Sequence, residues 1–196
     1  MNRQDKMILL WIHEASRVFF DRLTTEEDKE WFNKKIHDLA VGNLRMDVPF
    51  EELFVKKQIM FCDFMKRGLP MADRHYDEVK DFEMAVQKIK EYQLMYNEEP
   101  AHTNKFDLVM FPEAMQHICR ITRILRQPRG SVLLVGVGGS GKQTLTRLSA
   151  FISDCQFFSV EVKKSYSIKD FRLDLKKPML KAGAEQERSL FLLNNN

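Results

Sequence analysis

Glycines and a lysine are concentrated in one short segment of this sequence, in an order that suits phosphate binding. The segment fits the pattern G-x-x-x-x-G-K, and four of the chain's eight glycines lie within six of its residues. Glycine allows successive main-chain N–H groups to approach an anionic oxygen with no Cβ in the way. The pattern predicts a loop that binds a nucleoside triphosphate, with ATP as the expected ligand. The nucleotide-binding residues that we expect are Gly136, Val137, Gly138, Gly139, Ser140, Gly141, Lys142, Gln143 and Thr144.

The residues on either side of the loop support this prediction. Ser131 to Val135 is a short, apolar, β-rich run of the kind that lies buried in a parallel sheet. Lys142 opens a helical pattern that runs to about Ile152, so the positive end of the helix dipole would meet the phosphates. Lys142 itself would reach the β- and γ-phosphates. A strand, a glycine loop and a helix in this order favour a phosphate-binding loop over a glycine-rich turn without a ligand.

Magnesium binding has weaker support from the residues after the lysine. A phosphate-binding loop ordinarily continues with Ser or Thr, whose hydroxyl binds Mg²⁺, but here that position is Gln143. Thr144 lies about 100° further round the helix and cannot take the same place. The carbonyl oxygen of Gln143 offers a weaker contact. We therefore expect ATP with weakly held Mg²⁺, and we assign no certain metal ligand.

The acidic residues of a hydrolytic site are absent from their expected place. Leu190 to Leu193 has the pattern of a strand, and it is followed by Asn194 and Asn195 where such sites carry an acidic pair. An amide is neutral and cannot act as a general base near neutral pH. We therefore interpret Asn194 and Asn195 as degenerate acidic-strand positions, name no catalytic residue and expect little or no hydrolysis. The alternative is that the acidic strand follows the last residue of this chain.

Strands and helices alternate in the second half of the chain, which predicts an α/β fold with a parallel sheet. The first half has mainly helical patterns, including a second helix that is capped at Thr24 or Thr25 and stops at Gly42. The other predicted helices cover residues 5–23, 73–95, 112–127, 142–152 and 167–181, and the predicted strands cover 131–135, 156–160 and 190–193.

Composition argues against several classes of protein. The chain has 196 residues, of which 44% are hydrophobic and 30% charged, as in an ordinary globular domain. A net charge of +3 with interspersed signs gives no argument for a nucleic-acid partner. We find no signal-peptide pattern and no apolar run of membrane-spanning length, so we expect no membrane partner. The three cysteines form no metal-binding or disulfide pattern.

Longer stretches of the sequence resemble a known family. GVGGSGKQTLTRLSAFI and the preceding FDLVMFPEAMQHICRITRILRQPRGSVLLV are similar to the start of the fourth AAA+ module of an axonemal dynein heavy chain. SYSIKDFRLDLKKPMLKAG resembles the next helix of that module, and LWIHEASRVFFDRL resembles the closing helix of the third module's lid. The resemblance covers nearly the whole chain and is weakest between residues 41 and 75. Glutamine after the lysine is part of the family's pattern.

The resemblance implies a partial P-loop NTPase (AAA+) parallel sheet in the C-terminal half, preceded by an all-helical N-terminal segment. It divides the chain into a helical lid remnant of the preceding module at 1–42, a mostly helical connector at 43–105 and a truncated AAA+ P-loop domain at 106–196. The implied function is a regulatory ATP-binding module, in a ring of six, within a motor that walks on microtubules. The implied partners are other AAA+ modules, dynein chains and, through the parent motor, microtubules. The implied locations are the cytoplasm, the cytoskeleton and the ciliary axoneme, and the chain's length leads us to expect a fragment.

Some alternatives stay open. Arg17 falls where the lid arginine of the preceding module would sense its nucleotide, but an arginine on the surface of an amphipathic helix fits equally well. The chain as a whole could be a stand-alone P-loop NTPase, although it shows no complete acidic pair and no guanine-specifying N-K-x-D motif. It could also be a scaffold fragment with a vestigial P-loop. Nucleotide titration and a phosphate-release assay separate these functions.

Overall fold

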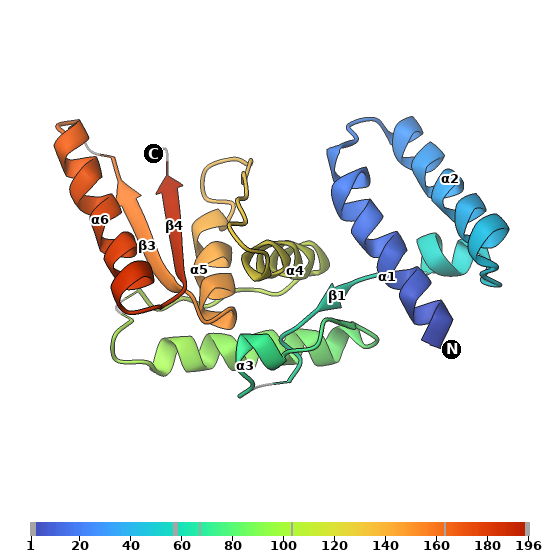
Figure 1. Ribbon diagram of the computed structural model, residues 1–196, viewed down its shortest axis with the longest axis horizontal. Helices are drawn as coiled ribbons and strands as arrows, with labels where there is room; N and C mark the ends of the chain where they lie inside the picture. Colours follow the sequence, from blue (N-terminus) through green and yellow to red (C-terminus); the bar gives the residue numbers. More distant parts are fainter. Residues whose placement is uncertain (1–2, 57–58, 67, 103, 163, 195–196) are drawn as a thin grey trace. The chain divides into compact units, whose positions relative to one another are not determined.

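The computed structural model describes residues 3–56, 59–66, 68–102, 104–162 and 164–194. The chain forms two compact units. Unit 1 comprises Met1–Asp63 and His75–Asp81, and unit 2 comprises Phe64–Arg74 and Phe82–Asn196. Unit 1 is mainly helical, whereas unit 2 combines helices with a parallel strand pair (Figure 1), so the predicted α/β class is confirmed.

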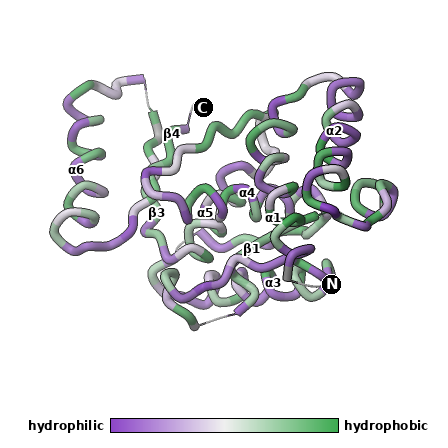
Figure 2. Tube along the Cα trace, turned by 45° about the vertical axis from the view of Figure 1, so that its right-hand side comes forward, coloured by the Kyte–Doolittle hydropathy of each residue, from purple (hydrophilic) through white to green (hydrophobic). Residues whose placement is uncertain are grey.

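Unit 1 is built around two helices, α1 (Arg3–Val18) and α2 (Glu26–Leu44), with a 3₁₀ turn at Phe20–Arg22 between them. The helix α2 begins at Thr25, whose hydroxyl accepts the N–H of Asp28, as the capping pattern predicts. It continues through Gly42 and ends at Arg45 in the left-handed conformation, so the predicted stop at Gly42 is wrong. Hydrophobic and hydrophilic residues alternate along the helices (Figure 2), as expected for elements with one packed face. The buried core of unit 1 consists of Ile8, Leu9, Ile12, Ile36, Ala40, Met46, Leu53 and Phe61.

A short antiparallel pair follows the π-helical turn at Glu52–Lys56. The strands are β1 (Phe61–Cys62) and β2 (Asp77–Glu78), and the N–H of Val79 also donates to the carbonyl of Met60, at 2.8 Å. These bonds take up main-chain groups that a helix from residue 73 would need. The predicted helix at 73–95 therefore begins only at Phe82, in unit 2.

Unit 2 is a layered arrangement of helices and two parallel strands. The helices are α3 (Phe82–Glu98), α4 (Pro112–Arg126), α5 (Lys142–Ile152) and α6 (Ile168–Ala184), and a 3₁₀ turn covers Met71–Asp73. The strands β3 (Gln156–Glu161) and β4 (Ser189–Asn194) pair in parallel, from Gln156 opposite Ser189 to Glu161 opposite Asn194. Figure 1 shows α6 and α5 on either side of this pair. The guanidinium carbon of Arg147 on α5 lies 4.9 Å from the centroid of the Phe157 ring on β3.

The predicted strand at Ser131–Val135 is absent, which corrects the sequence-based expectation. These residues belong to no helix or strand, and Leu133 and Val135 are 87% and 88% exposed. A strand requires a hydrogen-bonded neighbour. In the part of the chain that the structure describes, the parallel sheet contains only β3 and β4, which pair with each other. The segment therefore has the composition of a buried strand without the neighbour that would bury it.

Candidate functional site

The glycine loop leads directly into α5, as the sequence predicts. Lys142 is the first residue of that helix and Gly141 is its N-cap. Gly139 and Gly141 have φ angles of +77° and +75°, in the left-handed region where residues with a Cβ are strained. These two glycines thus set the turn that leads into Lys142, whose side chain folds back to the loop.

The Lys142 side chain closes the loop into a ring. Its Nζ donates to the carbonyls of Gly136 and Val137, at 2.8 and 2.7 Å, and to Oγ of Ser140, at 3.1 Å. Three groups of the loop therefore surround one positive charge at the N-terminal end of α5. The N-terminus of a helix also attracts anions. The ammonium of Lys142 and the dipole of α5 would therefore both attract an anion to this end of the helix.

Gly136 leaves room at the centre of this ring. A Cβ at that position would lie 3.1 Å from Ser140 Oγ and 3.6 Å from Lys142 Nζ. Around Gly138, by contrast, a Cβ would meet nothing within 4 Å. The space at Gly136 is therefore reserved for the lysine and its acceptors, as expected of a loop that brings backbone and ammonium close to a phosphate. The residues present fit a nucleotide's phosphates.

The two residues after Lys142 differ in exposure. Gln143 is exposed and Thr144 is half-buried, so the amide of Gln143 is accessible beside the loop. Thr146 was not predicted as part of the site. Its buried hydroxyl donates to the carbonyl of Lys142, at 2.7 Å, and stabilises the first turn of α5. A threonine four residues after the motif lysine is the signal that would have indicated this contact.

The end of β4 lies at the same end of unit 2 as the glycine loop (Figure 1). Asn194 is the last residue of β4, opposite Glu161 of β3, while Asn195 lies outside the described residues. The strand extends one residue further at this end than the sequence predicts, because Asn194 lies within β4. No group of three His, Cys, Asp or Glu side chains within the described residues is arranged to hold a metal ion.

Arg17 belongs to unit 1, whereas the glycine loop belongs to unit 2. The guanidinium of Arg17 forms an ion pair with Asp21, one helical turn on, at 3.3 Å, and its side chain is 15% exposed. It lines a pocket of about 420 Å³ together with His13, Asn33 and apolar residues of the same unit. His13 is buried, and its ring contacts the Tyr76 hydroxyl at 2.9 Å.

The other end of α5 is held by two arginines from distant parts of the sequence. Arg74 donates to the carbonyl of Ile152, at 2.6 Å, and to the carboxylate of Asp154. Arg188 donates to the carbonyl of Ser153, at 2.9 Å, and to that of Leu125 at the end of α4. Positive charge near the last carbonyls of a helix is favourable.

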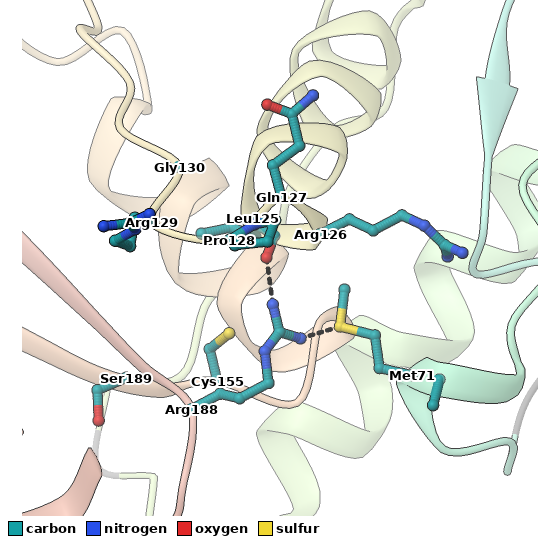
Figure 3. A pocket seen from close by; sticks show the side chains of 11 residues that line it. Met71, Leu125, Arg126, Gln127, Pro128, Arg129, Gly130, Cys155, Arg188 and Ser189 are labelled. Carbon is teal, nitrogen blue, oxygen red and sulfur yellow. Dashed lines mark hydrogen bonds between the residues drawn. The ribbon is translucent and has the colours of Figure 1, made fainter. Parts of the chain in front are cut away.

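Arg188 forms one wall of a pocket of about 610 Å³ (Figure 3). Its guanidinium reaches towards Leu125 and Met71, while the side chains of Arg126 and Arg129 point away from it and from each other. Burial raises the pKa of the neighbouring Cys155 thiol, against the opposing effect of the Arg188 charge. The arginines in this pocket therefore do not converge on a common point, and Arg188 connects helix ends.

Comparison with known proteins shows which proteins are related to this chain. Residues 106–196 match the family model of the P-loop containing dynein motor region D4. Dynein axonemal heavy chain 10 from Homo sapiens is 39% identical over 190 residues, which cover 97% of this chain. Dynein axonemal heavy chain 1 from Rattus norvegicus is 39% identical over 194 residues, again 97% of this chain. Dynein axonemal heavy chains are homologues of this chain.

The similarity to dynein heavy chains extends over both units, because the matches begin well before the D4 region. The chain nevertheless spans only 4% of the length of each of these heavy chains. None of the helices in the described residues combines the length and apolarity that crossing a bilayer requires.

Proposed function

We propose that this chain binds ATP through the loop from Gly136 to Thr144, as a regulatory AAA+ module of a dynein-type microtubule motor. The observation that carries the proposal is the ring of contacts around Lys142 at the N-terminus of α5. Its position within the stretch that matches dynein region D4 supports the assignment to a dynein-type module.

Different residues of the loop have different roles in the proposed binding. The ammonium of Lys142 attracts the β- and γ-phosphates as a mobile point charge. The turn fixed by Gly139 and Gly141 places α5 so that its first N–H groups face the same anion. Magnesium, when bound with the nucleotide, would neutralise charge on the phosphate oxygens. The exposed amide of Gln143 is a weak oxygen ligand for it, so we propose loose retention of Mg²⁺.

We further propose that the module hydrolyses ATP slowly or not at all. The strand β4 ends in Asn194, and the next residue is Asn195. Neither amide can accept the proton of an attacking water near neutral pH, and neither brings negative charge to a metal ion. A site that binds without rapid turnover suits regulation, because its occupancy can persist.

We infer the position of the chain in a larger protein, its partners and its location from the homologous dynein heavy chains. We place the chain at the junction of the third and fourth AAA+ modules, with 1–42 in the lid of the third module, 43–105 as connector and 106–196 in the P-loop domain of the fourth. The proposed partners are other AAA+ modules and dynein chains, with microtubules reached through the parent motor. The proposed locations are the cytoplasm, the cytoskeleton and the axoneme of the cilium. We propose no nucleic-acid and no membrane partner.

Two assays test the proposal. Titration of the purified chain with MgATP should give saturable binding, and a phosphate-release assay on the same preparation should give negligible turnover. Ordinary ATPase turnover would instead indicate a stand-alone P-loop NTPase. Absence of binding by well-folded protein would indicate a scaffold fragment with a vestigial loop. Either result would contradict the proposed regulatory module.

A further inference from the structure

The ammonium of Lys142 has three N–H donors and three acceptors within the loop. Two acceptors are the main-chain carbonyls of Gly136 and Val137. A substitution at either position would not remove its carbonyl group. The third is the hydroxyl of Ser140, an exposed residue. Ser140 is therefore the one side chain, among those described, that holds the ammonium at the loop, and a substitution can remove it.

The Ser140 hydroxyl differs from the carbonyls in both geometry and chemistry. Its distance from Lys142 Nζ is 3.1 Å, against 2.8 and 2.7 Å for the carbonyls of Gly136 and Val137. A phosphate oxygen carries negative charge, so it attracts the ammonium more strongly than the neutral hydroxyl does. An arriving phosphate would therefore replace the hydroxyl before it replaces either carbonyl.

We propose that Ser140 is a positioning residue for Lys142, which rests on the proposed nucleotide-binding function. Its hydroxyl keeps the third N–H of the ammonium at the loop and is the acceptor that a phosphate oxygen replaces. A long lysine side chain loses rotamer entropy when it is held in one position. Holding the ammonium before the ligand arrives reduces the entropy that is lost on binding.

The first test measures Lys142 directly and needs no nucleotide. The chain is treated with a low concentration of an acetylating reagent, and the modification rate of each lysine is followed by mass spectrometry. Ser140→Ala should raise the rate at Lys142 about threefold, which corresponds to losing part of one hydrogen bond. Ser140→Thr, which keeps the hydroxyl, should stay near the wild-type rate. Exposed Lys176 is the internal reference, and Ser165→Ala is the matched control variant.

The second test measures affinity for MgATP in the same variants. Ser140→Ala should weaken binding about three- to tenfold, and Ser140→Thr should restore it. An unchanged modification rate at Lys142 in folded Ser140→Ala protein would overturn the positioning role. So would an equal loss of affinity in Ser140→Thr, because a merely structural disturbance would not distinguish the two variants.

The two tests separate the two proposals. If wild-type protein binds no MgATP while Lys142 still reacts faster in Ser140→Ala, the proposed function fails and the positioning of Lys142 by Ser140 stands. If wild-type protein binds MgATP and neither measurement responds to Ser140→Ala, the function stands and the role of Ser140 is wrong. Circular dichroism of each variant shows that the chain has folded.

Discussion

The two ends of α5 are stabilised in opposite ways. At its N-terminus, the contacts of Lys142 reach back only two to six residues, to Ser140, Val137 and Gly136. At its C-terminus, Arg74 reaches Ile152 from 78 residues away, and Arg188 comes from a segment 35 residues beyond Ser153. The first end carries the loop for which we propose an exchangeable ligand, whereas the second end is held by contacts with distant parts of the fold. If the proposed site binds its ligand, the helix can do so at one end while the rest of the fold secures the other end.

Replacing the lysine should give the largest effect and should be confined to the ligand end. Lys142→Ala removes the charge and every contact of the ammonium, so affinity for MgATP should fall about 30-fold or more. The midpoint of urea unfolding should stay close to wild type, because the lysine contacts are exposed. Isothermal titration calorimetry and urea unfolding measure the two quantities. A large loss of stability would contradict the proposed difference between the ends.

Removing an arginine at the packed end should affect stability instead. Arg188→Ala leaves the carbonyls of Ser153 and Leu125 without this donor, which should cost about 2 kcal/mol of unfolding free energy. Urea unfolding followed by far-UV circular dichroism measures the loss. Both tryptophans, Trp11 and Trp31, lie in unit 1, so their fluorescence is an internal control that should not shift. A shift of both signals together would show that the units unfold as one.

A pair of glycine substitutions sharpens the comparison within the loop. Gly141→Ala forces a Cβ into the left-handed region and should destabilise the chain by about 1 kcal/mol. Gly138→Ala is the matched control, because its Cβ would meet no atom within 4 Å and its φ is not left-handed. Thermal unfolding of the two variants should differ in midpoint. Equal midpoints would mean that the turn before Lys142 is not fixed as described.

The smallest expected effect concerns a helix start far from either arginine. The capping box of α6 joins Ser167 and Asp170, and hydrogen bonds from Ser167 lower the pKa of the Asp170 carboxyl. Ser167→Ala should cost about 0.5 kcal/mol near neutral pH, at the low end for a helix cap because these contacts are exposed. A carboxyl with a lowered pKa stabilises the fold above its ordinary pKa and loses that contribution as the pH falls through the lowered value. The difference between variant and wild type should therefore narrow in acid, as measured by urea unfolding across pH.

Local signals made parts of the fold predictable. The start of α5 after Gly141 and its end near Ile152 agree with the sequence-based prediction, as does the start of α6 next to Ser167. Each depends on residues within a few positions of one another. The glycine loop was recognisable for the same reason, although its binding of ATP stays a prediction.

Features that depend on distant residues were not predictable. The sequence at 73–81 suits a helix, but Asp77 and Glu78 pair with β1 instead. The run at 131–135 suits a buried strand, yet strand formation depends on a neighbour that its own sequence does not reveal. The roles of Arg74 and Arg188 at the end of α5 could not be predicted from the sequence, because they bind main-chain carbonyls, which every residue has.

The irregular run from Ser131 to Val135 bears on the thermodynamics of the proposed binding. Its amides lie outside any hydrogen-bonded ladder, so they should exchange with deuterium far faster than the amides shared between β3 and β4. If this upstream segment becomes ordered when the loop binds phosphate, the conformational entropy lost would offset part of the favourable binding free energy. The measured affinity for the nucleotide would then reflect the cost of ordering residues 131–135 as well as the strength of the contacts that the loop makes with phosphate.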